Sequence, residues 1–192
     1  MFSFKPTNYI KLSDEKLLMA IQNGDSKAFN ELYKRYNARL LYYFYRMLGN
    51  DKETAKDFLQ ELFYKIIDKP HLYDSKRKFS TWIFSIAHNM CKNEYRSRGV
   101  RSILEKIENT DCFVEEHEAE NEYPFKVEDI FECLNEFDEI HSTAFLLKYR
   151  EGLNIDEISS ILEIPKGTVK SRLFYMRKKI QEKLNVEKIE RD

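Results

Sequence analysis

Apolar residues recur three or four positions apart along most of the chain, which is the spacing of one face of an α-helix. In the first half this pattern is interrupted by Gly24, Gly49 and Pro70, so it predicts four helices with short connections. Ser13, directly before two acidic residues, is typical of the N-cap of the first helix. Four amphipathic helices so close together can share one core, and residues 10–100 are therefore predicted to form a helical domain.

The third and fourth predicted helices differ in how their apolar residues are spread. The third carries a clean stripe made of Ala55, Phe58, Leu59, Leu62, Phe63, Ile66 and Ile67. The fourth, from about Ser80 to Ser97, has a narrow apolar stripe of Phe79, Ile83, Ile86 and Met90. A neighbouring arc offers ring, amide and cationic groups that can hold unstacked bases, namely Trp82, Asn89, Asn93 and Arg96, with Ser85 and Lys92 beside them. Trp82 lies at the border of the two arcs, and burial between helices fits it as well as base contact does.

Near the C-terminus the segment NIDEISSILEIPKGTVKSRLFYMRKKIQEKL has the pattern of a helix-turn-helix. Asn154 can cap a short first helix, Pro165 lies in the turn, and Thr168 is predicted to begin the second helix. The inward stripe of that second helix is Val169, Leu173, Met176, Ile180 and Leu184. An amphipathic hairpin with a solvated basic face would show the same pattern, but the turn, the stripe and the charge together favour DNA binding.

Lys170, Ser171, Phe174, Tyr175 and Lys178 lie on the side of this second helix opposite its stripe. The helix offers two kinds of group for a DNA duplex. Cationic side chains suited to phosphates are Lys166, Arg177, Lys178 and Lys179. Candidates for base edges or thymine methyl groups are Lys170, Ser171, Phe174 and Tyr175. Tyr175 could instead pack on the backbone.

Composition and charge indicate that the chain consists of two basic parts joined by an acidic segment. The chain has 192 residues, 42% of them apolar and 34% charged, with only five Gly and four Pro, which favours an all-α fold. The net charge of −1 hides an asymmetry, because residues 105–139 contain 14 acidic side chains and only two lysines, giving −12 there and +11 elsewhere. Residues 101–125 are therefore predicted to be an acidic, flexible linker.

Several classes of protein are disfavoured by what the sequence lacks. No uncharged run approaches the roughly 20 residues needed to span a bilayer, and the first residues do not form a secretion signal, so we expect a cytoplasmic protein. His88 and Cys91 could share one side of a helix, but two ligands without a partner cluster make a poor zinc site. The sequence has no Gly-rich phosphate loop, no paired metal-binding histidines and no nucleophile motif. We therefore predict no metal, no cofactor, no small-molecule substrate, no catalytic residue and no enzymatic activity.

Four segments together resemble a bacterial RNA polymerase sigma factor of the extracytoplasmic-function (ECF) type, the short class that keeps only the second and fourth conserved regions. These segments read GDSKAFNELYKRY, ETAKDFLQELFYKI, FSTWIFSIAHNMCKNEYRSR and GLNIDEISSILEIPKGTVKSRLFYMRKKI. The resemblance implies a region 2-like helical domain over residues 10–100 and a region 4-like helix-turn-helix domain over residues 126–186. It also implies that the linker between them runs through the positively charged RNA-exit path of the polymerase, although a simple spacer fits its composition equally.

For the N-terminal half the resemblance implies two binding surfaces. Contacts with the clamp helices of the polymerase β′ subunit are expected from Asp57, Gln60, Glu61 and Phe63. A solvated polar face on a core helix is the alternative for the three polar residues. Binding of the −10 promoter element as a single strand, with one base flipped into a pocket, is expected from Trp82, Asn89, Lys92, Asn93, Arg96 and Arg98. Many members of the family have Asp where this chain has Asn93, which bears on the −10 preference.

For the C-terminal half the resemblance implies binding of the −35 element as a duplex, together with contact to the polymerase β flap. The residues expected at the −35 element are Lys166, Thr168, Lys170, Ser171, Arg172, Phe174, Tyr175, Arg177 and Lys178. Tyr175 replaces a frequently basic residue, and Glu163 replaces a frequent Gly in the turn. The family often has an anti-sigma partner, in some cases bound to a membrane.

A two-domain helix-turn-helix regulator that acts on duplex DNA without joining the polymerase is the alternative interpretation. Its C-terminal motif would look the same. It does not account for the basic and aromatic stretch over residues 76–101, which has seven basic residues and only Glu94 as an acidic one.

Overall fold

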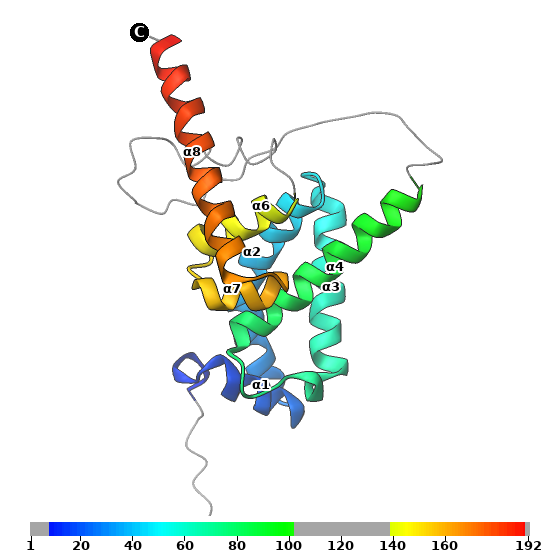
Figure 1. The fold of residues 1–192 in the computed structure, drawn as a ribbon. Coiled ribbons are helices and arrows are strands. Elements are labelled where there is room, and N and C mark those ends of the chain that lie inside the picture. The colour runs from blue at the N-terminus through cyan, green and yellow to red at the C-terminus, as the bar shows by residue number, and fades with distance from the viewer. Residues whose placement is uncertain (1–7, 102–138, 191–192) are drawn as a thin grey trace, which may run out of the picture. The chain divides into compact units, whose positions relative to one another are not determined.

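The computed structural model describes residues 8–101 and 139–190, with side chains described for residues 8–97 and 141–183. Over these ranges every regular element is helical (Figure 1). The chain divides between Arg96 and Ser97 into two compact units. The predicted all-α fold is confirmed. The predicted linker, the periodic segment over residues 127–137 and the Leu184 side chain lie outside what is described.

The N-terminal unit contains four α-helices and two 3₁₀ turns. In chain order these elements are η1 (Tyr9–Lys11), α1 (Asp14–Gln22), α2 (Ser26–Met47), α3 (Lys52–Asp68), η2 (Pro70–Leu72) and α4 (Phe79–Arg101). Helix α1 packs against α2, and α2 packs against α3. The long helices α2, α3 and α4 are the blue, cyan and green ribbons of Figure 1.

Side-chain caps fix where the first three helices begin. The Ser13 hydroxyl accepts a hydrogen bond from the backbone N–H of Lys16, as the sequence predicted. Asp25 and Asp51 each accept two backbone N–H groups at the starts of α2 and α3. Between these helices Gly49 (φ 81°) and Asn50 (φ 61°) both adopt left-handed backbone, which Gly tolerates freely and Asn better than most residues. This double left-handed turn lies in the four-residue connection, 48–51, between α2 and α3.

Arg35 of α2 ties the N-terminal segment to the helices. Its Nη1 donates to the Leu12 carbonyl (2.9 Å) and to Asp14 Oδ1 (2.7 Å). Its Nη2 donates to the carbonyls of Tyr9 (3.1 Å) and Ile10 (2.9 Å), and its Nε donates to Glu31 (2.8 Å). These bonds use all five donors of the guanidinium. Burial opposes the charged form, but the hydrogen bonds that the guanidinium donates to the two carboxylates outweigh it and raise the pKa of Arg35.

An aromatic cluster joins α4 to α2 in the core of this unit. The rings of Tyr36 and Phe79 meet edge to face at 5.2 Å, and those of Tyr43 and Phe84 do so at 5.6 Å. All four side chains are almost fully buried. The Tyr36 hydroxyl donates to Asp14 at 2.5 Å, and burial, together with this carboxylate, raises the pKa of Tyr36. Helix α4 is therefore held as a core element along its first half.

The C-terminal unit is built around the predicted helix-turn-helix. Its elements are α6 (Glu139–Phe145), the short π-helical turn η4 (Leu146–Arg150), α7 (Ile155–Leu162) and α8 (Lys166–Glu190). Helix α8 packs against both α6 and α7, and Figure 1 shows it running on past them. Asn154 caps α7 as predicted, and it forms a reciprocal capping box with Glu157.

The turn between α7 and α8 differs from the prediction by two residues. Helix α8 begins at Lys166 rather than at Thr168, because the Pro165 carbonyl already accepts the first helical hydrogen bond, from Val169. A proline just before the first turn loses nothing, since its missing N–H would have had no helical partner. Glu163 ends α7 in a left-handed conformation with φ 56° and ψ 38°.

Two predicted core stripes need correction. On α3, Ile67 is 50% exposed and does not belong to the core. On α4, Ile86 is only half-buried, and burial spreads over a wider arc than the predicted stripe because Phe84, Ala87, His88 and Cys91 are also buried. The predicted stripe of α8 is confirmed at Val169, Leu173, Met176 and Ile180.

Candidate nucleic-acid interface

Helix α4 keeps one narrow arc outside the core, and this arc carries most of the predicted −10 residues. Asn89, Asn93 and Arg96 are exposed, and Lys92 is half-buried beside them. Their positions at i, i+3, i+4 and i+7 place them on one side of the helix. The Arg98 backbone belongs to α4, but its side chain lies outside the described range. The arc therefore presents two amides flanked by cations.

Trp82 lies at the edge of this arc and is 9% exposed. Its ring contacts Tyr73 at 5.2 Å and Phe79 at 5.7 Å, both in tilted or edge-to-face geometry. The sequence left open whether Trp82 is buried between helices or contacts a base, and in the structure most of its side chain is buried. Little of this side chain is therefore accessible to a base.

The start of α4 is fixed by a residue distant in the sequence. The backbone N–H of Phe79 donates to Glu15 Oε1 of α1 at 3.1 Å, so a carboxylate occupies the positive end of the α4 dipole. Burial alone would raise the pKa of Glu15. Hydrogen bonds from the N–H groups of Glu15 and Phe79 and from Ser13, together with the nearby Lys78, outweigh that effect and lower it.

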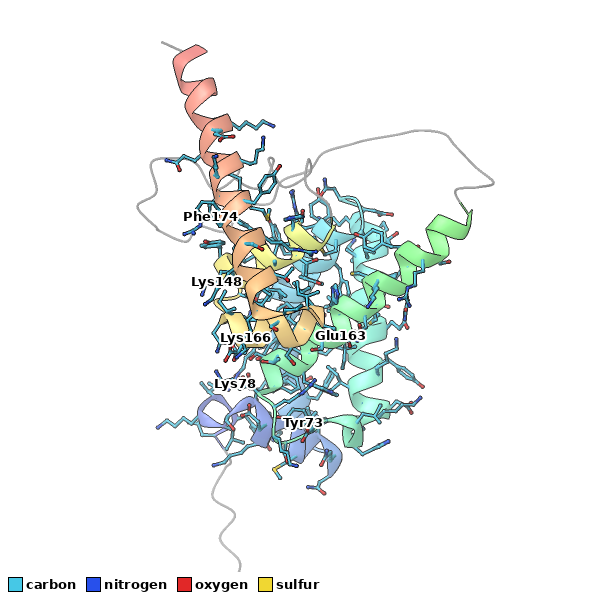
Figure 2. All side chains as sticks on the ribbon, viewed as in Figure 1. Tyr73, Lys78, Lys148, Glu163, Lys166 and Phe174 are labelled. Carbon is cyan, nitrogen blue, oxygen red and sulfur yellow. The ribbon has the colours of Figure 1, made fainter. Side chains whose placement is uncertain are left out.

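Sequence reasoning missed the loop that leads into α4. Tyr73 donates its hydroxyl hydrogen to the Arg77 carbonyl, and Asp74 accepts the backbone N–H of Lys76, so the loop is held by its own hydrogen bonds. Lys76, Arg77 and Lys78 are exposed just before α4, and Figure 2 labels Tyr73 and Lys78 there. The run of cations was visible in the sequence, whereas the contact between Tyr73 and Trp82 had no sequence signal.

Helix α3 presents a mixed polar and apolar face. Asp57, Gln60 and Glu61, which the sequence predicted to meet the polymerase, are exposed. Phe63, predicted with them, is instead 3% exposed and packs against the rings of Phe29 (5.9 Å) and Tyr33 (4.7 Å). Its position on the apolar stripe of α3 turns it to the core, so it is not part of the exposed surface.

Two apolar side chains on the exposed face of α3 were not predicted as part of a site. Tyr64 is 67% exposed and Ile67 is 50% exposed, and both share the side of the helix that carries Asp57, Gln60 and Glu61. Large apolar groups set among polar ones on a surface are typical of protein-binding sites. The signal that could have found Tyr64 is its spacing of i+3 and i+4 from Glu61 and Gln60.

Helix α8 exposes a broad surface opposite its buried stripe. The predicted −35 residues that are exposed are Lys166, Lys170, Ser171, Phe174, Tyr175, Arg177 and Lys178, whereas Thr168 and Arg172 are half-buried at the border. Phe174 is 62% exposed, a large value for an apolar ring. In Figure 2, Lys166 and Glu163 are labelled at the turn before α8 and Phe174 further along the helix.

The charges on α8 remain mostly positive in spite of two nearby carboxylates. Lys166 Nζ lies 2.8 Å from Asp156 of α7, in an exposed ion pair of the kind that contributes little to stability. Lys178 and Lys179 each lie 3.9 Å from Glu182, at the limit of an ion pair. Between Lys166 and Leu184, Glu182 is the single acidic residue against seven basic ones. This surface therefore suits a polyanion.

Both halves of the chain match families of known function. Residues 32–101 match the family Sigma-70 region 2, and residues 128–180 match Sigma-70, region 4. Over 184 residues the chain is 32% identical to an ECF RNA polymerase sigma-E factor of Haemophilus influenzae, covering 91% of this chain and 96% of that protein. The chain belongs to the ECF family of RNA polymerase sigma factors. As a sigma factor it directs promoter recognition, and the regulator that does not join the polymerase is not favoured.

Other relatives of this sigma factor also align with it over most of its length. It is 29% identical over 181 residues to the RNA polymerase sigma-H factor of Pseudomonas aeruginosa, covering 89% of this chain and 93% of that one. The solved structure of CnrH in complex with the cytosolic domain of CnrY aligns with a TM-score of 0.65 at 21% identity, covering 90% and 97% of the two chains. A sigma factor RpoE from Bartonella quintana, solved with the anti-sigma factor NepR, aligns with a TM-score of 0.63 at 24% identity, covering 81% and 98%. These likenesses show the same fold.

Two further observations concern only the described residues of the sigma factor. Within residues 8–101 and 139–190, no three His, Cys, Asp or Glu side chains lie close enough together to hold a metal ion. In the same ranges, no helix combines the length and the apolar character required to cross a bilayer. The family consists of polymerase subunits rather than enzymes.

Proposed function

We propose that this sigma factor divides promoter recognition between two helices, with α8 binding the −35 element as a duplex and α4 binding the −10 element as a single strand. The observation that carries the proposal is the exposure of seven of the nine predicted −35 residues on α8, with Ser171 and Lys178 directly opposite its buried stripe. In these terms residues 10–100 act on the −10 element and the polymerase, residues 126–186 act on the −35 element, and residues 101–125 join them.

Helix α8 has the groups that a major groove requires. Lys166, Arg177 and Lys178 are exposed cations that can neutralise phosphates, so binding should weaken as salt rises. Lys170 and Ser171 can bond base edges, and the exposed Phe174 ring can contact a thymine methyl group. The first helix of the motif, α7, would then lie across the DNA backbone.

Helix α4 is better suited to separated bases. Its exposed arc is narrow, and the amides of Asn89 and Asn93 can bond the Watson–Crick edge of a base that has left the stack. Opening DNA costs about 1.4 kcal/mol per base-pair step, and each captured base returns about 1–3 kcal/mol. Strand capture by α4 can therefore offset melting once the polymerase holds the DNA.

The exposed face of α3 is the proposed contact with the polymerase β′ clamp helices. Asp57, Gln60 and Glu61 supply polar groups, and Tyr64 and Ile67 supply apolar area that is otherwise left in water. A mixture of this kind is typical of a protein interface whose centre is apolar and whose rim is polar. Phe63 supports this face from the core instead of touching the partner.

Further partners are proposed from the relatives. The RpoE structure contains an anti-sigma factor, and we extend a partner of this class to the present chain. Contact of the C-terminal unit with the polymerase β flap and residence in the cytoplasm, where the polymerase acts, follow from the same assignment.

The experiment that tests the proposal combines the purified chain with core RNA polymerase and two fluorescent probes. One probe is the non-template −10 strand and the other is the −35 duplex. We expect tight binding to core, and binding of the −10 strand only in that complex. Specific binding of duplex DNA without polymerase, with no association with core, would contradict it.

Matched variants connect the surfaces to their partners. Lys170→Ala should weaken transcription that depends on the −35 element and leave core binding unchanged. Gln60→Ala together with Tyr64→Ala should weaken core binding and leave the α8 surface intact. Loss of core binding in Lys170→Ala would mean that the two surfaces are wrongly assigned.

A further inference from the structure

One side chain on the outward surface of α8 is held by a residue outside the helix-turn-helix. The ring of Tyr175 lies 6.0 Å from the ring of His141 in α6, centroid to centroid, with the two planes tilted by 52°. The Nζ atom of Lys179, one turn further along α8, lies 5.9 Å from the centroid of the same ring. Tyr175 is nevertheless 49% exposed.

These contacts distinguish Tyr175 from its neighbour Phe174. Phe174 is 62% exposed, whereas Tyr175, on the other flank of the outward surface, contacts His141 of α6. A half-exposed tyrosine that is free to change rotamer pays conformational entropy when it binds. A ring contact with His141 reduces that cost, because the orientation is already restricted before DNA arrives.

The chemistry of tyrosine restricts which base pair it can favour. Arg and Lys recognise guanine through its O6 and N7 atoms, and the phenol ring of tyrosine cannot reproduce a bidentate contact of this kind. Its ring edge can instead pack on the C5-methyl group of thymine, while its hydroxyl can donate to or accept from a base edge. A tyrosine held in one orientation should therefore prefer a T·A pair to a G·C pair at the position that it faces.

We propose that His141 is a positioning residue for the −35 reader, holding Tyr175 so that this tyrosine selects a T·A over a G·C base pair within the element. Lys179 restrains the same ring from within α8. The proposal rests on the proposed role of α8 in −35 binding. It adds that specificity at one base pair depends on α6, which lies outside the α7–α8 motif.

The test measures −35 preference with the full chain in complex with core polymerase, using promoters whose −35 element is randomised. Tyr175→Ala should lower the discrimination between T·A and G·C at one base pair by about two- to tenfold, the range expected for one ring contact. His141→Ala should lower it at the same base pair, and His141→Phe, which keeps a ring, should preserve it. Tyr175→Arg should shift the preference at that pair toward guanine.

Two further readouts separate positioning from a general structural role. His141→Ala should leave the dependence of binding on salt unchanged, because His141 is not expected to bind a phosphate. His71→Ala, which changes an exposed histidine of the other unit, should alter none of these quantities. If His141→Ala does not fold, the comparison of His141→Phe with the two Tyr175 variants still tests the proposal.

Three results would overturn the inference. The first is an unchanged preference for T·A over G·C in His141→Ala. The second is a loss of binding in that variant that is equal for every −35 sequence. The third is that His141→Ala and Tyr175→Ala change the preference at different base pairs. Failure of the underlying function looks different, because Lys178→Ala and Ser171→Ala would then also leave −35 binding unchanged.

Discussion

Helices α4 and α8 are both proposed to read DNA, yet they are built into their units in opposite ways. Between residues 79 and 91, helix α4 is buried over most of its circumference and leaves one narrow arc in water; the buried side chains include Phe79, Ile83, Phe84, Ala87, Met90 and Cys91. Over residues 166–183, helix α8 buries a single line of four residues, Val169, Leu173, Met176 and Ile180, and most of its other side chains are exposed.

The difference corresponds to the form of DNA that each helix is proposed to bind. A major groove about 12 Å wide must receive a whole helix, which has to stand out from its domain. A separated base is small and can be held by one or two side chains at the edge of a rigid surface. The fraction of its circumference that a DNA-binding helix buries therefore indicates whether it suits separated bases or the major groove of a duplex.

The largest expected effect is on the free energy of unfolding, and it is tested by the same substitution, Phe to Ala, in each of the two helices. Phe84→Ala should destabilise the N-terminal unit by about 3–5 kcal/mol, because Phe84 is fully buried and packs on Tyr43 and Arg39. Phe174→Ala should change stability by less than about 0.5 kcal/mol, since the ring is mostly in water. Both variants are unfolded in urea. The fluorescence of Trp82, the only tryptophan, follows the N-terminal unit in Phe84→Ala, and circular dichroism follows Phe174→Ala. Equal losses in the two variants would remove the contrast between the helices.

A reciprocal pair tests the two kinds of DNA. Asn89→Ala should weaken binding of the −10 strand by about 1–3 kcal/mol without changing its dependence on salt, because an amide bond to a base is lost. Lys178→Ala should instead lower the slope of log K against log salt for the −35 duplex by about 0.9, the value for one phosphate contact. Both are measured with the holoenzyme and the separate probes. The comparison fails if either variant affects the other probe equally.

A smaller effect concerns only the helix-turn-helix. Glu163→Gly should stabilise the C-terminal unit by about 1 kcal/mol, because Glu163 has φ 56° and glycine occupies this region without the clash of a Cβ atom. Hydrogen exchange of the amides in α7 and α8 measures this gain in stability, with the amides of α2 as the internal control. Glu163→Ala, which keeps the Cβ atom, should show no such gain.

The smallest expected effect is a pH dependence confined to the N-terminal unit. The folded pKa of Glu15 lies below its ordinary value of 4.5, so the folded state binds this proton less readily than the unfolded state does. Its contribution to stability is therefore complete above pH 4.5 and is lost as the pH falls through the lowered folded pKa. Glu15→Gln should flatten this part of the unfolding curve, followed by Trp82 fluorescence between pH 6 and pH 3. A curve of unchanged slope would show that the bond to Phe79 is not charge-dependent.

Much of this architecture follows from local rules in the sequence. Helix boundaries were predictable because Ser13, Asn154, Gly24 and Gly49 stop or cap helices through their own backbone chemistry. The stripe of α8 was predictable because a helix that is anchored on one line obeys a simple period. The start of α8 was missed by two residues, since Pro165 can precede a helix as well as end one.

The parts that were not predictable depend on contacts between distant segments. The width of the buried arc on α4 depends on the approach of α2, which the pattern of α4 alone does not contain. Trp82 is placed by Tyr73 in a loop, and Phe63 is turned to the core by Phe29 and Tyr33. Tyr64 and Ile67 were ambiguous because a partner surface and a core face use the same residue types.

The five hydrogen bonds of Arg35 also determine which fragment of this chain can be studied alone. The match to Sigma-70 region 2 begins at residue 32, in the middle of α2, whereas Arg35 reaches back to Tyr9, Ile10, Leu12 and Asp14. Glu31, the fifth acceptor, also lies before residue 32, so a fragment cut where the family match begins would lose the acceptors of all five bonds, each at a cost of about 1 kcal/mol. The smallest unit that can be produced in isolation therefore has to begin before Tyr9.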